Sequence, residues 1–202
     1  MIVLDSYDLF GDYILSYIIG NIIENDKNKN NTDSINKKIN KINNFKNNNY
    51  NKFINNFINN LDSFNNFRNC RNGGNYDKKV NIIEIGIGYN IKTGLFLNKY
   101  DNLNLTVLDI NKEAINYCKS KGLNGYVEDI RSPKYPLYDK THLIYSIRPP
   151  RDLQNDILNI CKNYNIPMII KPLSNETPLE CLKLSNYKGL AIYLWEPNKN
   201  KK

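Results

Sequence analysis

Metal-ligating and disulfide-forming residues are scarce in this chain of 202 residues, which contains one histidine and four cysteines. The cysteines form no C-x-x-C pair, and none has a histidine close to it in the sequence. Structural zinc sites and disulfide frameworks both depend on such spacings. The sequence therefore indicates neither kind of site, and we expect reduced cysteines that contribute to packing.

Long apolar runs are absent as well. The longest strongly apolar stretch, residues 13–23, is about half of the roughly 20 residues that a membrane helix needs. The first residues of the chain are acidic and apolar, without the basic segment that opens a secretory signal. We therefore expect no membrane association and a cytoplasmic location.

The composition changes abruptly along the chain. Apolar side chains at helical spacing over residues 6–24 predict a helix, so residues 1–24 form a first part that packs on the core. Residues 25–79 form an Asn/Lys-rich insert, in which 21 of the 51 residues from 25 to 75 are Asn. Because Asn is a poor helix former, we predict that this insert is disordered or partly helical. Residues 80–197 form the folded domain, and residues 198–202 a basic tail.

The positive charge is concentrated in the insert. The net charge of +8 at first suggests a polyanionic partner such as nucleic acid. Residues 25–79, however, contain 11 Lys and Arg against 4 Asp and Glu, whereas the other 147 residues contain 17 against 16. A coding bias toward Asn, Lys, Ile and Tyr explains this charge, and nucleic-acid binding through the insert stays an alternative.

Short β-branched runs alternate with helical segments from residue 80 onward. The expected strands cover residues 80–85, 103–110, 125–127, 143–147, 167–170 and 190–195. The expected helices cover residues 91–99, 112–121, 152–163 and, more briefly, 178–184. This alternation predicts right-handed βαβ units and a Rossmann-like α/β fold, in which helices flank a mostly parallel sheet. After the fifth strand we expect only the short helix and one strand.

A Gly-x-Gly turn follows the first strand of the domain. Gly86 allows a tight turn, and Gly88 lets a ligand approach the backbone without a Cβ in the way. Asp109 ends the next strand, where an acid can hydrogen-bond ribose hydroxyls. Asp129 follows the third strand, where it either reaches an adenine edge or caps a turn. The same turn also occurs in α/β proteins that bind no cofactor.

The residues around this turn discriminate among cofactors. Ile91 stands where the dinucleotide motif G-x-G-x-x-G and the phosphate loop each need a glycine, which disfavours NAD and nucleoside triphosphates. With Glu84 the sequence reads E-x-G-x-G, followed by Asp109, and this pattern resembles the cofactor site of class I S-adenosylmethionine-dependent methyltransferases. The resemblance implies that Asp109 holds the ribose diol and that Glu84 acts on the amino-acid end directly or through water. It also implies that the loop of Gly86 and Gly88 passes the methionine and ribose, with Asp129 near the adenine.

A second resemblance covers residues 80–196. The chain is similar to an uncharacterised archaeal protein family, UPF0146, in Ile82-Ile-Glu-Ile-Gly-Ile-Gly, Val127-Glu-Asp-Ile, Leu143-Ile-Tyr-Ser-Ile-Arg-Pro-Pro, Ile169-Ile-Lys-Pro-Leu and Asn186-Tyr-Lys-Gly. The string Tyr-Ser-Ile-Arg-Pro-Pro is the most specific of these. The resemblance implies a Rossmann-like methyltransferase fold, from which the Asn/Lys-rich insert is a departure.

Three polar residues stand at the carboxyl ends of the fourth and fifth expected strands. Ser146, Arg148 and Lys171 are candidate catalytic residues, because ligands of open parallel sheets bind at the carboxyl ends of the strands. Cations there indicate an anionic small-molecule substrate, or alternatively pair with acids to hold the loops. His142 begins the fourth strand at the opposite edge, so we expect no catalytic role for it.

The sequence thus predicts a methyltransferase that uses S-adenosylmethionine and acts on an unidentified substrate. One alternative is a non-catalytic module that binds S-adenosylmethionine or a nucleotide. The other is a nucleic-acid-associated protein that binds through its insert.

Overall fold

The computed structural model describes residues 6–27, 79–134, 136–173 and 175–197. Most of the Asn/Lys-rich insert and the basic tail lie outside these residues, so nucleic-acid binding through the insert stays a prediction. The chain divides into two compact units. One comprises residues 1–12, 80–99 and 103–202, and the other comprises residues 13–79 and 100–102. Among the described residues, no helix combines the length and the hydropathy that crossing a membrane requires.

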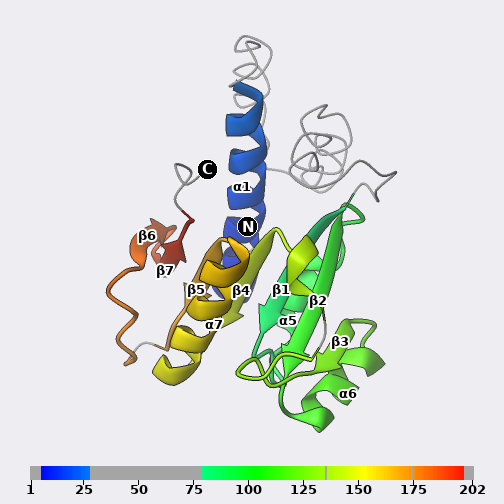
Figure 1. Cartoon of the computed structure of the whole chain (residues 1–202). Helices are drawn as coiled ribbons and strands as arrows, with labels where there is room; N and C mark the ends of the chain where they lie inside the picture. The colour runs from blue at the N-terminus through cyan, green and yellow to red at the C-terminus, as the bar shows by residue number, and fades with distance from the viewer. Residues whose placement is uncertain (1–5, 28–78, 135, 174, 198–202) are drawn as a thin grey trace. The chain divides into compact units, whose positions relative to one another are not determined.

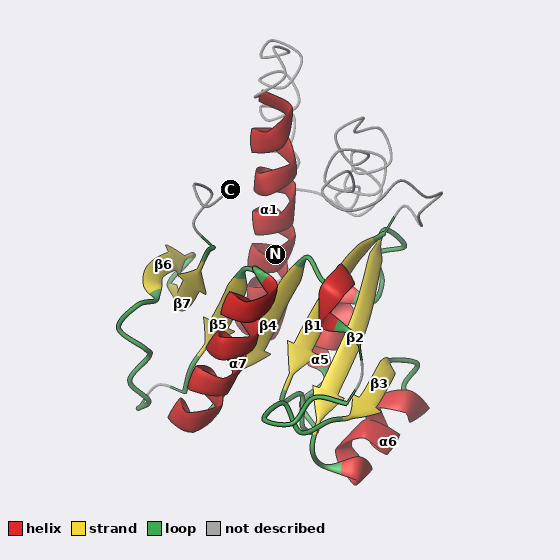
Figure 2. Ribbon diagram, viewed as in Figure 1, coloured by secondary structure: helices red, strands yellow, loops and turns green. Residues whose placement is uncertain are grey.

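The first unit is built on a seven-stranded sheet (Figures 1 and 2). Its strands are β1 (Val80–Ile85), β2 (Leu103–Asp109), β3 (Asn124–Val127), β4 (Leu143–Ile147), β5 (Met168–Lys171), β6 (Lys183–Tyr187) and β7 (Leu190–Trp195). They lie in the order β3-β2-β1-β4-β5-β7-β6. Strands β1 to β5 are parallel, and β7 is antiparallel to both of its neighbours. The predicted Rossmann-like fold is thereby confirmed.

The helices are α1 (Ser6–Lys27), α5 (Lys92–Leu97), α6 (Lys112–Ser120) and α7 (Arg151–Tyr164), with a short 3-10 helix η1 (Tyr138–Lys140) before β4. Figure 2 shows α7 across β4 and β5, with α5 on the opposite face of the sheet. Neighbouring side chains of a strand point to opposite faces. In β1, Ile83 and Ile85 therefore join the core under α7, while Glu84 faces α5.

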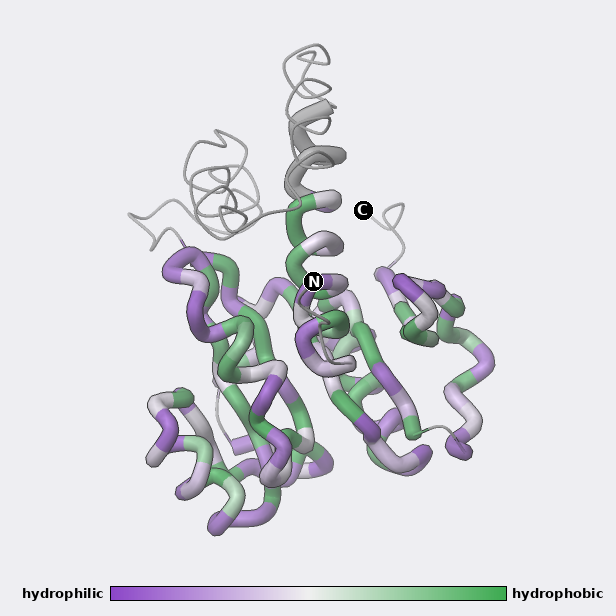
Figure 3. Tube along the Cα trace, turned by 180° about the vertical axis from the view of Figure 1, so that it is seen from behind, coloured by the Kyte–Doolittle hydropathy of each residue, from purple (hydrophilic) through white to green (hydrophobic). Residues whose placement is uncertain are grey.

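Apolar residues fill the space between the sheet and α7. Ile157 and Cys161 of α7 are fully buried, and so are Ile144 of β4 and Ile170 of β5. Figure 3 shows the hydrophobic residues running along the strands, with hydrophilic residues in many of the connections. The buried strands are rich in Ile and Leu, as expected for parallel strands that helices cover on both faces.

The first turns of α1 belong to the same unit as the sheet. The fully buried Phe10 packs edge to face on Tyr145 of β4, with 6.1 Å between the ring centroids. Gly11 permits close packing on Phe96, because a Cβ there would lie 2.4 Å from the nearest ring carbon. Asp12 accepts hydrogen bonds from the Tyr187 hydroxyl at 2.7 Å and from the Lys188 ammonium at 2.8 Å. These contacts fix the start of α1.

The prediction of a helix at residues 178–184 and a single strand after β5 was wrong. The segment instead ends in β6, which pairs with β7 in a hairpin. Lys188 and Gly189 form its two-residue loop with φ of 52° and 85°, the positive values that suit the twist of a hairpin. Strand β6 lies at the sheet edge and is largely polar, so it lacks the apolar run by which the other strands were found.

The contacts of Asp12 generate a stability prediction. Asp12→Ala removes the acceptor of two hydrogen bonds to α1, one of them from a charged donor, and should lower the free energy of unfolding by about 2 kcal/mol. Urea unfolding measures this loss. Asp139→Ala, which changes an exposed acid in η1, is the matched control and should alter stability by less than about 0.5 kcal/mol. Equal stability of the two variants would contradict the prediction.

Candidate cofactor and substrate site

The glycine loop lies between β1 and α5 at the carboxyl edge of the sheet. Gly86 and Gly88 have φ of 71° and 54°, which favour glycine. The Gly86 N–H donates to the Leu108 carbonyl at 2.8 Å, which holds the loop on β2. A Cβ at Gly88 would meet no atom within 4 Å, so the backbone there borders open space. The loop thus has the geometry that a close-lying ligand requires.

Asp109 and Gly88 are brought together as the sequence led us to expect. Asp109 Oδ2 accepts the Gly88 N–H at 2.8 Å, and Oδ1 accepts the Asn111 N–H at 2.8 Å. The carboxylate therefore links the glycine loop to the start of α6. Each oxygen accepts one of these backbone N–H groups, and a carboxylate oxygen has a second lone pair for another donor. The Gly88 N–H, by contrast, points to Asp109 rather than to a ligand.

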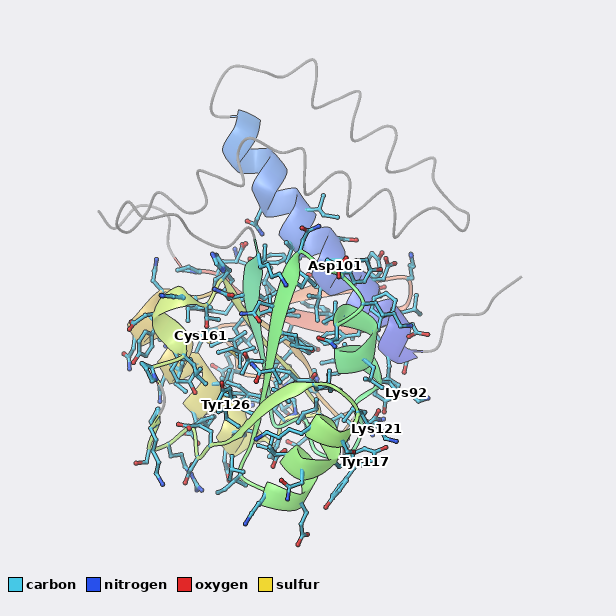
Figure 4. The ribbon with its side chains drawn as sticks, turned by 90° about the vertical axis from the view of Figure 1, so that its right-hand side faces the viewer. Lys92, Asp101, Tyr117, Lys121, Tyr126 and Cys161 are labelled. Atoms are coloured by element: carbon cyan, nitrogen blue, oxygen red, sulfur yellow. The ribbon has the colours of Figure 1, made fainter. Side chains whose placement is uncertain are left out.

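Exposed apolar side chains surround Asp109, and the sequence did not single them out. The exposed fraction is 62% for Ile110, 58% for Tyr89 and 40% for Val127, which pairs with Asp109 in the sheet. The ring centroids of Tyr89 and Tyr117 are 6.0 Å apart. Tyr117 lies on α6 and is labelled in Figure 4. The sequence signal for this surface was Ile110, directly after Asp109. We had expected Ile110 to be the last residue of the strand. These side chains offer an apolar surface to a planar base.

The acids after β3 have different surroundings. Asp129 accepts hydrogen bonds from Arg131 Nε at 3.0 Å, from its Nη2 at 3.2 Å and from its backbone N–H at 3.1 Å. The Arg131 side chain lowers the pKa of Asp129 below its usual value. Asp129 thus caps a turn, one of the two roles that the sequence left open, and its contact with an adenine stays a prediction. Glu128 is 97% buried, and its Oε2 has no hydrogen-bond partner among the described residues.

Glu84 is enclosed between β1 and α5. Its Oε2 accepts the hydroxyl hydrogen of the fully buried Tyr145 at 2.7 Å, across the β1–β4 pair. A Cβ on Gly94 of α5 would lie 3.2 Å from the same oxygen, so the helix covers the carboxyl group closely. Burial raises the pKa of Glu84 to about 8, although the Tyr145 hydrogen bond lowers it. Glu84 is therefore mostly protonated at neutral pH, and its contact with a cofactor stays a prediction.

Ser146 is also buried. Its hydroxyl donates to the Ile85 carbonyl at 2.7 Å and thereby joins β4 to the last residue of β1. This bond places Ser146 beneath the glycine loop as a support, and its catalytic role stays a prediction. At the opposite edge, His142 Nδ1 accepts the Asn81 N–H at 3.0 Å, away from the glycine loop as expected.

The structure brings Arg148 and Lys171 together. The Arg148 N–H donates to the Lys171 carbonyl at 2.7 Å, and both cationic groups lie over the ring of Tyr7. Lys92, the first residue of α5, joins them there. Neither Tyr7 nor Lys92 was predicted, because no local pattern links the start of α1 to the carboxyl edge. Arg151 behaves differently, since it donates to the carbonyls of Thr177 and Pro178 and so holds the loop after β5.

The sequence of this domain matches a known protein family. The model of the Uncharacterised protein family (UPF0146) matches residues 71–197, more than half of the chain. The chain belongs to this family. A UPF0146 protein of Methanocaldococcus jannaschii is 49% identical over 115 residues, which are 57% of this chain and 82% of that protein. A UPF0146 protein of Pyrococcus furiosus is 39% identical over 116 residues, 57% of this chain and 87% of that protein.

Similarity outside the family is shorter or weaker. Malonyl-[acyl-carrier protein] O-methyltransferase 2 of Ilyobacter polytropus is 40% identical over 84 residues, 39% of this chain and 32% of that enzyme. Among solved structures, an RNA methyltransferase from Salinibacter ruber in complex with S-adenosyl-L-homocysteine has a TM-score of 0.47 at 8% identity, covering 62% of this chain and 86% of that chain. The plantazolicin methyltransferase BpumL has a TM-score of 0.39 at 22% identity, covering 45% and 38%.

The buried Glu84 generates a prediction about pH. The native protein keeps a proton on Glu84 up to a pKa of about 8, whereas the unfolded chain releases it near the ordinary value of 4.5. The stability due to this proton is therefore complete below pH 4.5 and is lost as the pH rises through 8. Glu84→Gln keeps an acceptor for Tyr145 and removes the titration.

Urea unfolding across this pH range measures the difference. Relative to Glu84→Gln, the natural protein should lose stability by about 1.4 kcal/mol for each pH unit between the two pKa values. Glu180→Gln changes an exposed acid and should follow the natural protein at every pH. Parallel pH profiles of the natural protein and Glu84→Gln would show that Glu84 ionises normally in the native state.

Proposed function

We propose that this UPF0146 chain binds S-adenosylmethionine at the carboxyl ends of β1 and β2 and transfers its methyl group to a small-molecule substrate. The observation that carries the proposal is the pairing of Gly88 with Asp109. The backbone at Gly88 borders open space, and the carboxylate beside it is fixed by the Gly88 and Asn111 N–H groups. A ribose diol can donate to this carboxylate while the rest of the ligand passes the loop.

The residue at position 91 favours S-adenosylmethionine over phosphate-containing cofactors. Ile91 is 95% buried and stands directly before α5, where the dinucleotide motif has its third glycine. That glycine allows the close helix packing that accompanies a bound pyrophosphate. A cofactor without phosphates makes no such demand. The 84-residue similarity to an O-methyltransferase also supports methyl transfer.

The residues of the chain have distinct roles in this proposal. When bound, S-adenosylmethionine supplies a methyl group that its sulfonium already activates, so positioning by the protein is the main requirement. Asp109 orients the ribose, and the exposed side chains of Ile110 and Tyr89 pack on the adenine. Ser146 and the pair of Glu84 and Tyr145 hold the strand ends beneath the loop. We retain the prediction that the protein works in the cytoplasm.

The role of Asp109 predicts a binding defect. Asp109→Ala removes the ribose acceptor and should weaken S-adenosylmethionine binding by at least about tenfold, or 1.4 kcal/mol. Calorimetric titration with S-adenosylmethionine, S-adenosylhomocysteine, NAD and ATP measures this, and we expect the natural protein to prefer the first two. Asp139→Ala is the control. Absence of binding to all four ligands would refute the proposal, and unchanged affinity of a folded Asp109→Ala would place the ribose elsewhere.

The exposed isoleucine allows a second test that avoids effects on folding. Ile110→Ser should weaken S-adenosylmethionine binding by roughly fivefold. The reason is that a ligand that covers the Ile110 side chain removes apolar surface from water, which contributes about 1 kcal/mol to the free energy of binding. Leu184→Ser on β6 is a matched control, since the exposed fractions of Ile110 and Leu184 are 62% and 63%. Equal affinity of the two variants would show that the adenine does not lie on Ile110.

A further inference from the structure

Three cationic side chains converge on one aromatic ring at the carboxyl edge of the sheet. The distances to the centroid of the Tyr7 ring are 5.0 Å for Lys171 Nζ, 5.4 Å for Arg148 Cζ and 5.5 Å for Lys92 Nζ. No two of these groups are therefore farther apart than about 11 Å, which is twice the longest of these distances. This upper bound exceeds the screening length at physiological salt, about 8 Å, by only about 3 Å. We define the cation cluster as Tyr7, Lys92, Arg148 and Lys171.

The three cations come from separate elements, so their proximity is a property of the fold. Lys92 begins α5 directly after the glycine loop, Arg148 follows β4, and Lys171 ends β5. Arg148 and Lys92 are exposed, and Lys171 is half-buried. All three stand where open α/β sheets bind their ligands, beside the proposed cofactor loop.

Hydrogen bonds hold the segment that carries Tyr7, the aromatic residue of the cation cluster. The hydroxyl of the fully buried Thr93 donates to the Tyr7 carbonyl at 3.1 Å, which ties the first turn of α1 to α5. Lys171 Nζ donates to the Ser6 hydroxyl at 3.3 Å. The ring of Tyr7 is thus fixed against the strand ends, and its face attracts the cations that surround it.

The backbone at Arg148 supplies a second, independent observation. Its φ is 58°, in the left-handed region that residues with a Cβ rarely adopt. The bond from its N–H to the Lys171 carbonyl holds this conformation. Asn165 and Lys188 also have positive φ, but one ends α7 and the other forms the hairpin loop, where such values are common. Glycine would adopt this conformation at position 148 with less strain. The presence of arginine there indicates that its side chain has a role that offsets the strain.

We propose that the cation cluster binds a phosphate group of the methyl-accepting substrate. Three positive charges match a phosphate monoester dianion better than a single carboxylate, and the planar guanidinium of Arg148 can donate two parallel hydrogen bonds to its oxygens. As a statement about the substrate this inference rests on the proposed function. As a statement about an anion site it is tested separately from cofactor binding.

Calorimetric titration of the full chain with inorganic phosphate tests the site, with acetate as a monoanionic comparison. The natural protein should bind phosphate more tightly than acetate, and added NaCl should weaken this binding. Arg148→Gly removes the guanidinium and relieves the backbone strain, so it should bind phosphate at least about fivefold more weakly while unfolding at the same or a higher temperature. Lys171→Gln should also weaken phosphate binding, and Lys162→Gln in the last turn of α7 should not.

The outcomes separate this inference from the proposed function. Arg148→Gly should keep the natural affinity for S-adenosylmethionine, and Asp109→Ala should keep the natural affinity for phosphate. Loss of cofactor binding alone would refute the methyltransferase proposal and leave the anion site standing. The anion site is refuted if the natural protein binds no phosphate, or if Arg148→Gly and Lys171→Gln bind it as well as Lys162→Gln does. Destabilisation by both variants without any phosphate binding would instead assign the cations to packing on Tyr7.

Discussion

The joint between β1 and β4 is the constraint on which the carboxyl edge depends. The strand order reverses there, because the connections from β1 lead to β2 and β3 on one side while β4 and β5 lie on the other. Such a switch point opens a crevice between diverging loops. Side-chain hydrogen bonds cross this joint at adjacent positions, from Tyr145 to Glu84 and from Ser146 to the Ile85 carbonyl. Both are buried, so the strand ends that carry the loops are held rigidly.

The edge above this joint has two chemically different halves. The half at β1 and β2 offers a carboxylate held by backbone N–H groups and exposed apolar side chains. The half at β4 and β5 carries Arg148 and Lys171, two of the three cations that surround Tyr7. A sulfonium is positively charged and gains nothing from the second half, whereas an anionic acceptor does. Under the proposed function, this separation of charge along one edge would place the cofactor and the acceptor side by side.

Much of the fold could be predicted because buried parallel strands have a strong local signature. The β-branched and apolar runs gave the bounds of β1, β4 and β7 as the structure has them. Strand β6 was missed because its stability comes from pairing with β7 and from the turn at Lys188 and Gly189, neither of which needs an apolar run. The proximity of Gly88 and Asp109 was predictable, because it follows from two adjacent parallel strands that end at one edge.

The remaining parts of the site depend on contacts distant in sequence. Tyr7 precedes Arg148 by most of the length of the chain, and only the packing of the first turns of α1 on the sheet brings them together. Strand alternation turns Glu84 toward α5, where burial raises its pKa, and the local pattern did not indicate this. Its contact with a cofactor stays a prediction. Ser146 bonds to the Ile85 carbonyl on a neighbouring strand, which its residue type alone does not reveal. The turn capped by Asp129 is local, and the sequence offered it as one of two roles for this residue.

The two outer strands have a consequence for association between molecules. Unpaired strand edges invite pairing with another chain, and natural sheets suppress it with short or charged edge strands. Strand β3 is only four residues long. Strand β6 begins with Lys183 and continues with mostly polar residues, which makes it a poor template for a further strand. The polar residues of β6, which prevented its prediction from the sequence, thus protect the sheet against edge-to-edge aggregation.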